Sequence, residues 1–345
     1  MIPHNKPSLD NQESEAIAEV IASGWIAKGK KVAQFEREFA EYVGTEHAIA
    51  VNSGTAALYI ALKILGIDHQ GYNIYTSTYC CAAVINAIRA TDGHCELMDI
   101  DKSDFNITNI DKIDHHEAHA VIVPHTFGVP VEIKKSKYRR PYIIEDCSQA
   151  LGSYIDSQHV GLRGDIGIFS FGPSKMITTG SGGMLVTNNK NLADKSREFI
   201  DYDKHIPAFN FAMNDIQAAM GLVQLKKLPE FLHKRECMAR EYIKCILDTQ
   251  KYWMVQESNF NKRNWCRFVI IDECVQRLQR HLADNGITAI VPIEKHELLH
   301  NTLGIDSSGY TNAEYVATHS LSLPIYPDLY NNGFKKILDA LRCFE

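Results

Sequence analysis

Apolar strand-like runs alternate with helix-like periodic segments through the first two thirds of the chain. Residues 47–67 predict a strand, a turn and a helix, and residues 75–100 predict the end of a strand, a helix and a further strand. Further short buried strands are expected within the following segments: 118–128, 142–152, 165–172 and 182–188. Short apolar strands separated by helical patterns indicate an α/β domain with a mainly parallel sheet. Ligands bind to such sheets at the loops beyond the carboxyl ends of the strands.

The pattern changes in the last third of the chain. Residues 214–248 form one long helical pattern, which Pro229 is expected to kink or break. Residues 275–287 predict a helix that ends in an Asn-Gly pair. We therefore expect a large domain over residues 1–225 and a smaller α+β domain over residues 226–345.

Composition and charge narrow the class of protein. The chain has 345 residues, of which 45% are hydrophobic and 23% are charged, as in an ordinary globular protein. A net charge of −6 gives no basic surface for nucleic acid, and no apolar run approaches the roughly 20 residues that span a bilayer. Nine cysteines without a CxxC pair favour free thiols in a reducing compartment. The start, MIPHNKPSLDNQESE, lacks a secretory pattern, so we expect a cytoplasmic protein.

One lysine stands among unusually small residues. Lys175 lies in FGPSKMITTGSGG, between strand-like runs that end at Phe171 and start at Met184. A lysine in such a loop is ordinarily a solvated surface residue. The functional alternative is a lysine that forms a Schiff base with an aldehyde cofactor. That chemistry requires an amine of lowered pKa and a cradle that holds the cofactor.

Three other segments have the residue types of such a cradle. Residues 53–55 (S-G-T) stand where a strand turns into a helix, which favours either an anion site or a plain helix cap. Asp146 follows an apolar strand as a helix cap, a metal ligand or the carboxylate that keeps a pyridine nitrogen protonated. Gln149 could bind the phenolic oxygen of that ring, whereas Glu145 would point the other way along the strand. Ser170 is either a packed strand residue or a further phosphate ligand.

Taken in their order along the chain, these motifs match the pattern of a known protein family, and the match covers nearly the whole sequence. Its most specific segments are IIEDCSQALGS and VGLRGDIGIFSFGPSKMITTGSGGML, supported by AVNSGTAALYIAL and MNDIQAAMGLVQLKKL. The chain resembles the DegT/DnrJ/EryC1/StrS family of sugar aminotransferases, which use pyridoxal 5′-phosphate (PLP). The resemblance implies the fold type I aminotransferase architecture, a large domain whose mainly parallel mixed sheet is flanked by helices, and a smaller α+β C-terminal domain. It also implies a homodimer with shared active sites.

The resemblance implies roles for individual residues as well. Lys175 would form the internal aldimine, Asp146 would pair with the pyridine nitrogen, and Gln149 would contact the phenolic oxygen. The implied phosphate-binding residues are Ser53, Gly54, Thr55, Ser170 and, from the neighbouring subunit, Asn210.

Other implied positions concern the cofactor face and the substrate. Cys81, with Tyr79 two residues earlier, occupies the position where the family usually stacks an aromatic ring or a histidine on the cofactor. His125 matches a family position that lines the active site, although a structural histidine is the equal alternative. Trp265 and Arg267 fall in the smaller domain, where family members often recruit contacts to the nucleotide sugar, although a plain surface role is the alternative for each.

The implied reaction moves an amino group from glutamate to C3 or C4 of a nucleotide-linked keto sugar, in the biosynthesis of an amino sugar for a polysaccharide. The chain departs from the family pattern at Ser181, where glutamate is usual, at Ala212, where arginine is common, and at Cys81. Two alternatives therefore stay open. One is a PLP-dependent sugar dehydratase, although such relatives replace the lysine with histidine. The other is a non-catalytic regulatory or binding protein of the same fold.

One histidine-rich segment has residue types that could bind a metal. His115, His116 and His119 stand at spacings that a helix would place together. The segment lies between two strand-like runs, where a solvated connection is ordinary. We therefore expect no metal.

Overall fold

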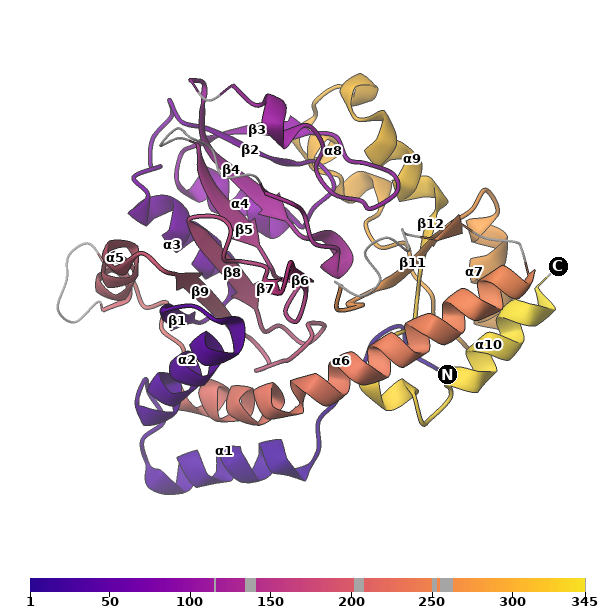
Figure 1. Cartoon of the computed structure of the whole chain (residues 1–345), viewed down its shortest axis with the longest axis horizontal. Helices are drawn as coiled ribbons and strands as arrows, with labels where there is room; N and C mark the ends of the chain where they lie inside the picture. Colours follow the sequence, from indigo (N-terminus) through magenta and orange to yellow (C-terminus); the bar gives the residue numbers. More distant parts are fainter. Residues whose placement is uncertain (115, 134–140, 202–207, 250–252, 255–262, 345) are drawn as a thin grey trace.

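The computed structural model describes residues 1–114, 116–133, 141–201, 208–249, 253–254 and 263–344 (Figure 1). Its large domain is built on a seven-stranded sheet in the order β1-β9-β8-β5-β4-β2-β3. The strands are β1 (His47–Val51), β2 (Asn73–Ser77), β3 (His94–Met98), β4 (Ala118–Pro124), β5 (Tyr142–Asp146), β8 (Ile166–Ser170) and β9 (Gly183–Thr187). Strands β3, β2, β4, β5 and β8 are parallel, and β9 is antiparallel to both of its neighbours. The predicted strands and the mainly parallel sheet are confirmed.

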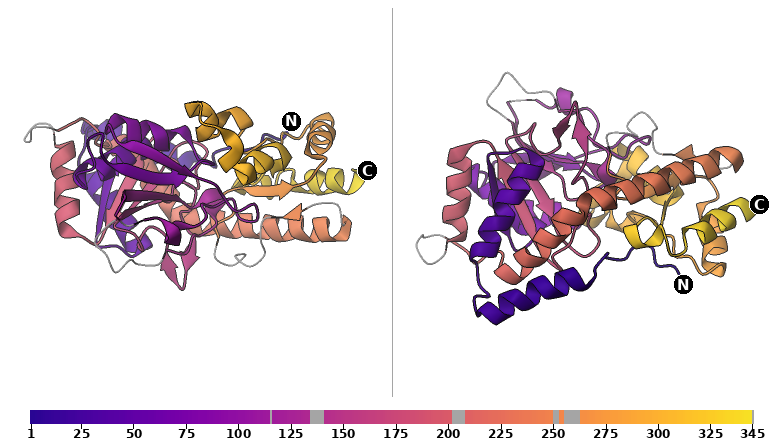
Figure 2. Two further views of the ribbon diagram at one scale, coloured as in Figure 1. Left: turned by 90° about the horizontal axis from the view of Figure 1, so that it is seen from above. Right: turned by 60° about the horizontal axis from the view of Figure 1, so that its bottom comes forward.

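Helices cover both faces of this sheet (Figure 2). They are α2 (Lys30–Val43), α3 (Gly54–Ile64), α4 (Ala82–Ala90), α5 (Lys190–Ile200) and the first half of α6 (Asp215–Thr249). Helix α1 (Asn11–Ser23) packs against α6 and, in the described chain, not against the sheet. In strand β1, successive side chains point to opposite faces of the sheet and therefore enter different cores. Ile49 and Val51 pack with α3, whereas Ala48 and Ala50 pack with α2 and α6. A sheet buried on both faces explains the nearly continuous apolar runs of its strands.

The first half of the chain also provides a rigid support beneath the lysine loop. In α2, Phe35 and Phe39 stand one helical turn apart on the buried face. Their rings lie 5.4 and 5.5 Å from the ring of Phe171, which directly follows β8. Phe39 also lies 5.1 Å from Phe169 within β8. This edge-to-face aromatic cluster fixes the strand end from which the lysine loop departs.

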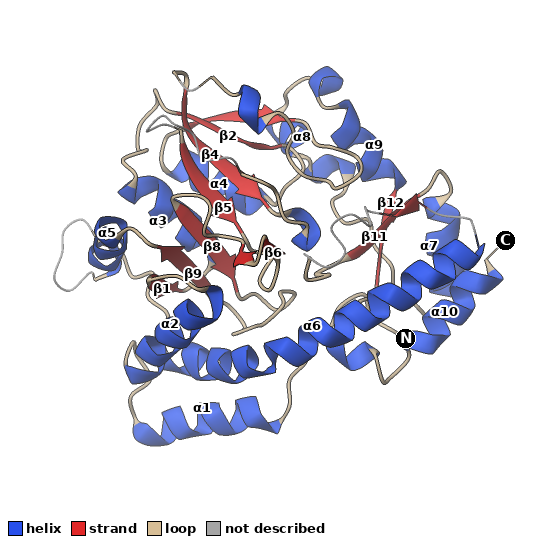
Figure 3. Ribbon diagram, viewed as in Figure 1, coloured by secondary structure: helices blue, strands red, loops and turns tan. Residues whose placement is uncertain are grey.

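Helix α6 links the two domains and runs unbroken over 35 residues (Figure 3). Of the kink or break expected at Pro229, the break was wrong and the kink stays a prediction. A proline within a helix removes one hydrogen bond and costs about 3 kcal/mol. Each half of α6 is held by a different core, with Leu222 and Leu225 in the large domain and Met238 and Tyr242 in the small domain. The predicted domain boundary at 225/226 falls within this continuous helix.

The small domain has an antiparallel sheet of three strands, in the order β10-β11-β12. Its elements are β10 (Trp253–Met254), β11 (Phe268–Ile271), α7 (Val275–Asp284), α8 (Leu299–Leu303), α9 (Thr311–His319), β12 (Ser320–Leu323) and α10 (Phe334–Cys343). Helix α7 ends before the Asn-Gly pair, as predicted, and Gly286 has a φ of 71°. A hairpin of β6 (Tyr154–Ile155) and β7 (Gln158–His159) completes the described strands. None of the helices in the described residues is long and apolar enough to cross a membrane.

The two sides of β11 face different parts of the molecule. Phe268 and Ile270 enter the small-domain core. Val269 and Ile271 instead join a cluster with Tyr79 and other residues of the large domain. This period of two follows from the pleat of a strand, and it makes β11 the inner wall between the domains.

Candidate active site

A cavity of about 290 Å³ lies beyond the carboxyl ends of the central strands and beside the N-termini of α3 and α4. The following predicted site residues line it: Ser53, Gly54, Thr55, Tyr79, Cys81, His125, Asp146, Gln149, Ser170 and Lys175. Segments far apart in the sequence therefore meet at one point, as expected for the switch region of a parallel sheet. Glu145 is buried and is not among the residues that line the cavity.

Lys175 lies in a loop that is tied down on both sides. Thr178 donates its hydroxyl to the carbonyl of Phe171, and its N–H donates to Gln224 Oε1 of α6. The backbone of Lys175 closes a tight turn with the carbonyl of Gly172 at 3.1 Å. Among the described residues, the Lys175 amine has neither a hydrogen bond nor an ion pair, and the side chain is half-buried. A fixed loop therefore presents an unpaired amine to the cavity.

Two glycines explain why small residues surround the lysine. Gly180 has a φ of 76°, a left-handed conformation that favours glycine. At Gly183 a Cβ atom would stand 2.5 Å from the carbonyl oxygen of Ser53. The start of β9 can therefore pass directly beneath the turn that precedes α3 only without a side chain.

The N-terminus of α3 has the chemistry of a phosphate site. Ser53 caps the helix by accepting the Ala56 N–H at 3.1 Å, so the cap reading of this serine is confirmed. The N–H groups of Gly54 and Thr55 have no acceptor within the helix and lie at the positive end of its dipole. A Cβ at Gly54 would stand 2.8 Å from the Cβ of Ser170, so glycine allows β8 to approach. The Ser170 hydroxyl makes no hydrogen bond within the described residues.

Asp146 and Gln149 line the same cavity. The N–H of Ser148 donates to one carboxylate oxygen of Asp146 at 2.9 Å, which orients the group at the end of β5. Gln149 Oε1 accepts the N–H of Phe127 at 3.1 Å. Because the side-chain oxygen of Gln149 accepts this bond, its NH₂ group is left to donate a hydrogen bond to a ligand. The cavity is therefore lined by both a carboxylate and an amide donor.

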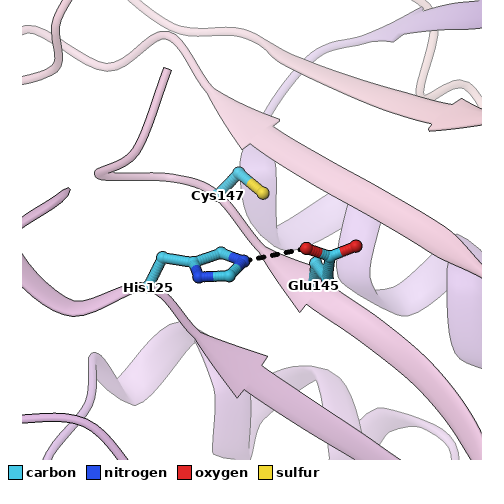
Figure 4. A group of neighbouring side chains, drawn as sticks. All are labelled: His125, Glu145 and Cys147. Atoms are coloured by element: carbon cyan, nitrogen blue, oxygen red, sulfur yellow. Dashed lines mark hydrogen bonds and ion pairs between the residues drawn. The ribbon is translucent and has the colours of Figure 1, made fainter. Parts of the chain in front are cut away.

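His125 belongs to a buried cluster beside the cavity (Figure 4). Its Nδ1 accepts the N–H of Val131 at 2.9 Å, so the ring proton is on Nε2. That nitrogen donates to Glu145 at 3.0 Å, and the carboxylate also accepts backbone N–H groups at Gly161, Arg163 and Gly164. Burial alone would raise the pKa of Glu145, but the hydrogen bond from His125 and the backbone donors hold it below its usual value.

The same cluster has the residue types of a metal site, since Cys147 lies beside His125 and Glu145 with ligand atoms within 4.8 Å of one another. Both ring nitrogens and both carboxylate oxygens already have partners, and burial raises the pKa of the Cys147 thiol. A metal would have to displace these bonds, so the cluster is a hydrogen-bonded support. His125 lines the cavity with its ring, and neither ring nitrogen is free to bind a ligand because both are already hydrogen-bonded.

His159 supplies a prediction about acid stability. Its Nε2 accepts the N–H of Gly152 at 2.7 Å, its Nδ1 donates to the carbonyl of Val160 at 2.6 Å, and burial lowers its pKa to about 4. The unfolded chain takes up a proton at this residue near pH 6.5, whereas the folded protein does not until about pH 4. The free energy of unfolding should therefore fall as the pH is lowered through this window, by up to about 1.4 kcal/mol per pH unit.

The measurement is urea denaturation between pH 7 and pH 4.5. His159→Gln should be less stable than the wild type at pH 7 but should lose less stability on acidification. An unchanged pH slope in this variant would contradict the assignment. His4, whose pKa burial lowers to about 3, remains in both proteins and serves as the common background.

The other predicted residues lie elsewhere. Tyr79 borders the cavity, but its ring is fully buried between the domains. Cys81 is exposed at the N-terminus of α4 and borders the cavity directly. Asn210 lines a second, larger hollow. Trp265 is 2% exposed in the small-domain core, and Arg267 precedes β11; neither is among the residues that line the two cavities.

Two further sets of residues complete the picture. Ile293 reaches the cavity from the small domain, and sequence reasoning missed it because a single apolar residue carries no motif. Of the three histidines weighed as metal ligands, His115 lies outside the described residues. His119 Nδ1 instead accepts the N–H of Asn73 at 3.2 Å. The N–H of His116 donates to Asp114 in an exposed turn.

Comparison with known proteins assigns the chain to a class. Residues 7–342 match the model of the DegT/DnrJ/EryC1/StrS aminotransferase family. The chain belongs to this family. The resemblance seen in the sequence is confirmed, and the protein is a PLP-dependent sugar aminotransferase of fold type I.

Individual relatives agree with this assignment. The chain is 31% identical over 364 residues to the GDP-perosamine synthase of Escherichia coli O157:H7, which covers 99% of this chain and 98% of that protein. It is 29% identical over 384 residues to the spore coat polysaccharide biosynthesis protein SpsC of Bacillus subtilis, covering 99% and 96% of the two chains. A solved family aminotransferase from Brucella abortus superimposes with a TM-score of 0.87 at 27% identity, covering 97% and 95%.

The residues of the cavity fit PLP. The unpaired amine of Lys175 suits the aldehyde, and the turn at Gly54 and Thr55 suits the phosphate. The Asp146 carboxylate and the Gln149 amide suit the ring nitrogen and the ring oxygen. A volume of about 290 Å³ is at the lower end for small-molecule sites, as expected for one flat cofactor.

Proposed function

We propose that this enzyme transfers an amino group from glutamate to the keto carbon at C3 or C4 of a nucleotide-linked sugar, and that it does so in the cytoplasm as a homodimer with shared active sites. The observation that carries the proposal is the unpaired Lys175 amine in one cavity with Asp146, Gln149 and the turn before α3. The name of the GDP-perosamine synthase supports a nucleotide-linked sugar, and the name of the spore coat polysaccharide biosynthesis protein SpsC supports a sugar destined for a polysaccharide.

The residues that line the cavity would hold and orient the cofactor, which carries out the electron chemistry. Bound PLP supplies the electron sink that stabilises a carbanion at the substrate carbon. Asp146, oriented by the Ser148 N–H, keeps negative charge at the ring-nitrogen end of the cavity. The Gln149 amide would donate to the ring oxygen, and Gly54, Thr55 and Ser170 would bind the phosphate.

Lys175 is the proposed acid–base group. With its amine free, Nζ would take the proton from the amino-bearing carbon of the donor and deliver it to the cofactor carbon that carried the aldehyde. In the second half-reaction it would move a proton in the opposite direction, to the sugar carbon that receives the amino group. Its backbone turn is held by hydrogen bonds, so that the amine moves by rotation of its own side chain. Movement of the lysine side chain is then enough to carry the proton between neighbouring atoms.

Spectroscopy distinguishes the candidate functions. The purified protein should be yellow, should bleach when glutamate is added, and should regain its colour with the correct keto sugar from a panel of nucleotide-linked sugars. Colour that does not respond to any amino donor would favour the dehydratase or a binding protein. A protein that takes up no PLP would favour binding alone.

A second hollow supports the shared-site dimer. A groove of about 1,160 Å³ adjoins the cofactor cavity at Ser53 and Ser181, and Asn210 lies on its wall. Trp25 lines the same groove and is 62% exposed. Nearby Ile26 is 53% exposed. An exposed apolar rim around a polar groove is typical of a protein interface, and a second copy could place its Asn210 at the phosphate.

Subunit complementation tests this arrangement. Lys175→Ala and Asn210→Asp should each inactivate the homodimer, the second because a carboxylate repels the phosphate. Co-expressed and purified by two tags, the mixed dimer contains one site with both changes and one intact site. It should regain roughly half of the wild-type activity per dimer. If each site were built from one subunit, the mixed dimer would be inactive, so the absence of recovery would contradict shared sites.

A further inference from the structure

Gln224 of α6 joins the loop that contains Lys175 (residues 171–182, the lysine loop) to the N-terminal part of the chain. The Gln224 side chain is 1% exposed. Its Oε1 accepts the N–H of Thr178 at 3.3 Å, three residues after the lysine. Its Nε2 donates to the carbonyl of Ser8 at 2.9 Å and to Glu13 Oε1 at 2.7 Å. One buried amide therefore connects three segments that are far apart in the sequence.

Thr178 is the residue through which this bond acts on the loop. It is 3% exposed. Its hydroxyl donates to the carbonyl of Phe171 at 3.2 Å and accepts the N–H of Gly180 at 3.0 Å, so Thr178 connects the two sides of the loop. Its N–H points out of the loop, to Gln224. Among the described residues, this is the one hydrogen bond that joins residues 173–179 to a segment outside the lysine loop.

The orientation of the Gln224 amide is set by the groups on its other side. An amide oxygen can only accept hydrogen bonds, whereas the NH₂ group donates two. The Glu13 carboxylate and the Ser8 carbonyl both accept, so the NH₂ group must face them and the oxygen is left to face Thr178. In the reversed orientation the NH₂ group would meet the N–H of Thr178, and the oxygen would meet a carboxylate.

Glu13 is itself held in one position on α1, which lies alongside α6 (Figure 1). Its Oε1 accepts from Gln224 and Lys227, at 2.7 Å each, and its Oε2 accepts from Lys227 and the N–H of Asp10, at 2.9 Å each. Burial alone would raise the pKa of Glu13, but the hydrogen bonds from Lys227, Asp10 and Gln224 hold it below its usual value. The carboxylate therefore stays ionised, and stays an acceptor, at neutral pH.

The rest of the contact between the lysine loop and α6 is apolar. Met176 and Ile177 are buried in the same core as Leu222 and Leu225 of α6. Apolar packing is not directional, whereas a hydrogen bond weakens steeply when its angle is poor. The packing therefore holds the loop against the helix, and the bond to Gln224 fixes the rotation of the backbone that follows the lysine.

We propose that Gln224, oriented by Glu13, is a positioning residue for Lys175, and that it fixes the backbone at Thr178 so that the lysine amine is presented to the cofactor cavity in one direction. This inference rests on the role proposed for Lys175. Gln224 is not among the residues that line the cavity, so it acts through the loop alone. A displacement of about 1 Å at a reacting group can cost about 100-fold in rate, so a small shift of the loop is enough to be measured.

The test is the rate at which colour develops when PLP is added to the full-length chain freed of its cofactor, a measurement that needs no amino donor. Gln224→Met keeps the length and the apolar packing of the side chain but loses its hydrogen bonds. It should slow colour development, and the later bleaching by glutamate, about 10- to 100-fold. Hydrogen exchange of the cofactor-free protein should show that the Thr178 amide exchanges faster, while the strands of the large sheet keep their protection.

An exchange of the two side chains tests whether Glu13 orients the amide. Gln224→Glu keeps an acceptor for Thr178 but places two carboxylates within hydrogen-bond distance of each other, so it should also slow colour development. Combining it with Glu13→Gln restores one amide and one carboxylate to the pair, and position 224 still accepts from Thr178. The double variant should recover most of the wild-type rate.

Asp10→Asn is the matched control for a change of charge. Asp10 also pairs with Lys227, at 2.8 Å, but its side chain is 55% exposed and, within the described chain, makes no hydrogen bond with Gln224. Asparagine still caps α1, so this variant should develop colour at the wild-type rate.

Each outcome decides the question. Unchanged colour development in Gln224→Met would overturn the proposal, and so would a double variant as slow as Gln224→Glu. Slowing that comes with faster exchange throughout the large domain would also overturn it, because Gln224 would then support the fold in general. If PLP colours the wild type at Lys175 but glutamate never bleaches it, the proposed donor fails, and the rates of colour development still decide the role of Gln224.

Discussion

Replacing Lys175 by alanine should abolish transamination while leaving the fold intact. The side chain is half-buried and makes no hydrogen bond in the described residues, so its removal leaves no polar group without a partner. Loss of an acid–base group typically costs about 10²–10⁴-fold in rate, and this residue is also the proposed covalent anchor of PLP. We expect a decrease in kcat of at least about 1,000-fold.

Mass spectrometry after borohydride reduction gives a second readout. The wild type should gain the mass of one reduced cofactor on the peptide that contains Lys175, and the variant should not. Lys190→Ala is the control, since Lys190 is exposed and, among the described residues, pairs with Asp194 on α5. Full activity, or a cofactor attached to another lysine, would reject the assignment of Lys175.

The change Asp146→Asn should produce the second-largest effect. Asparagine has the same shape and can still accept the Ser148 N–H through its oxygen, so the turn after β5 should hold. It cannot stabilise a protonated pyridine nitrogen, which removes most of the electron sink. We expect kcat to fall about 100-fold or more, corresponding to about 3 kcal/mol of lost transition-state stabilisation.

Two measurements separate this effect from a general loss of structure. The glutamate half-reaction should slow as much as overall turnover, whereas thermal stability without PLP should change little. Asp194→Asn, which alters an exposed carboxylate, should behave like the wild type. If Asp146→Asn retained the wild-type rate of bleaching, this carboxylate would not be the partner of the ring.

The strands and the cavity could be predicted because they depend on local pattern. Apolar runs that end in polar residues locate the strand ends, and a parallel sheet places those ends together. The glycines around Lys175 could also be understood from sequence, since Gly180 adopts a left-handed conformation and Gly183 passes beneath Ser53. The left-handed conformation at Gly180 is a local constraint, whereas the contact of Gly183 with Ser53 joins segments that are far apart in the sequence.

The features that sequence did not reveal depend on contacts between distant segments. Nothing local shows that the Tyr79 ring would be buried against the small domain, or that Ile293 would reach the cavity. The bonds of His125 to Glu145 and Val131 likewise require the folded sheet. The break expected at Pro229 failed because a local penalty of about 3 kcal/mol was outweighed by two separate cores.

The proline within α6 has a mechanical consequence. Because proline has no N–H group, the carbonyl of Leu225, one turn before Pro229, lacks the donor that another residue would supply. Helices bend most easily where their hydrogen-bond ladder is interrupted. Because the two halves of α6 are embedded in different cores, a rotation of one core against the other would concentrate its strain at Pro229, and the helix would act as a jointed lever between the domains.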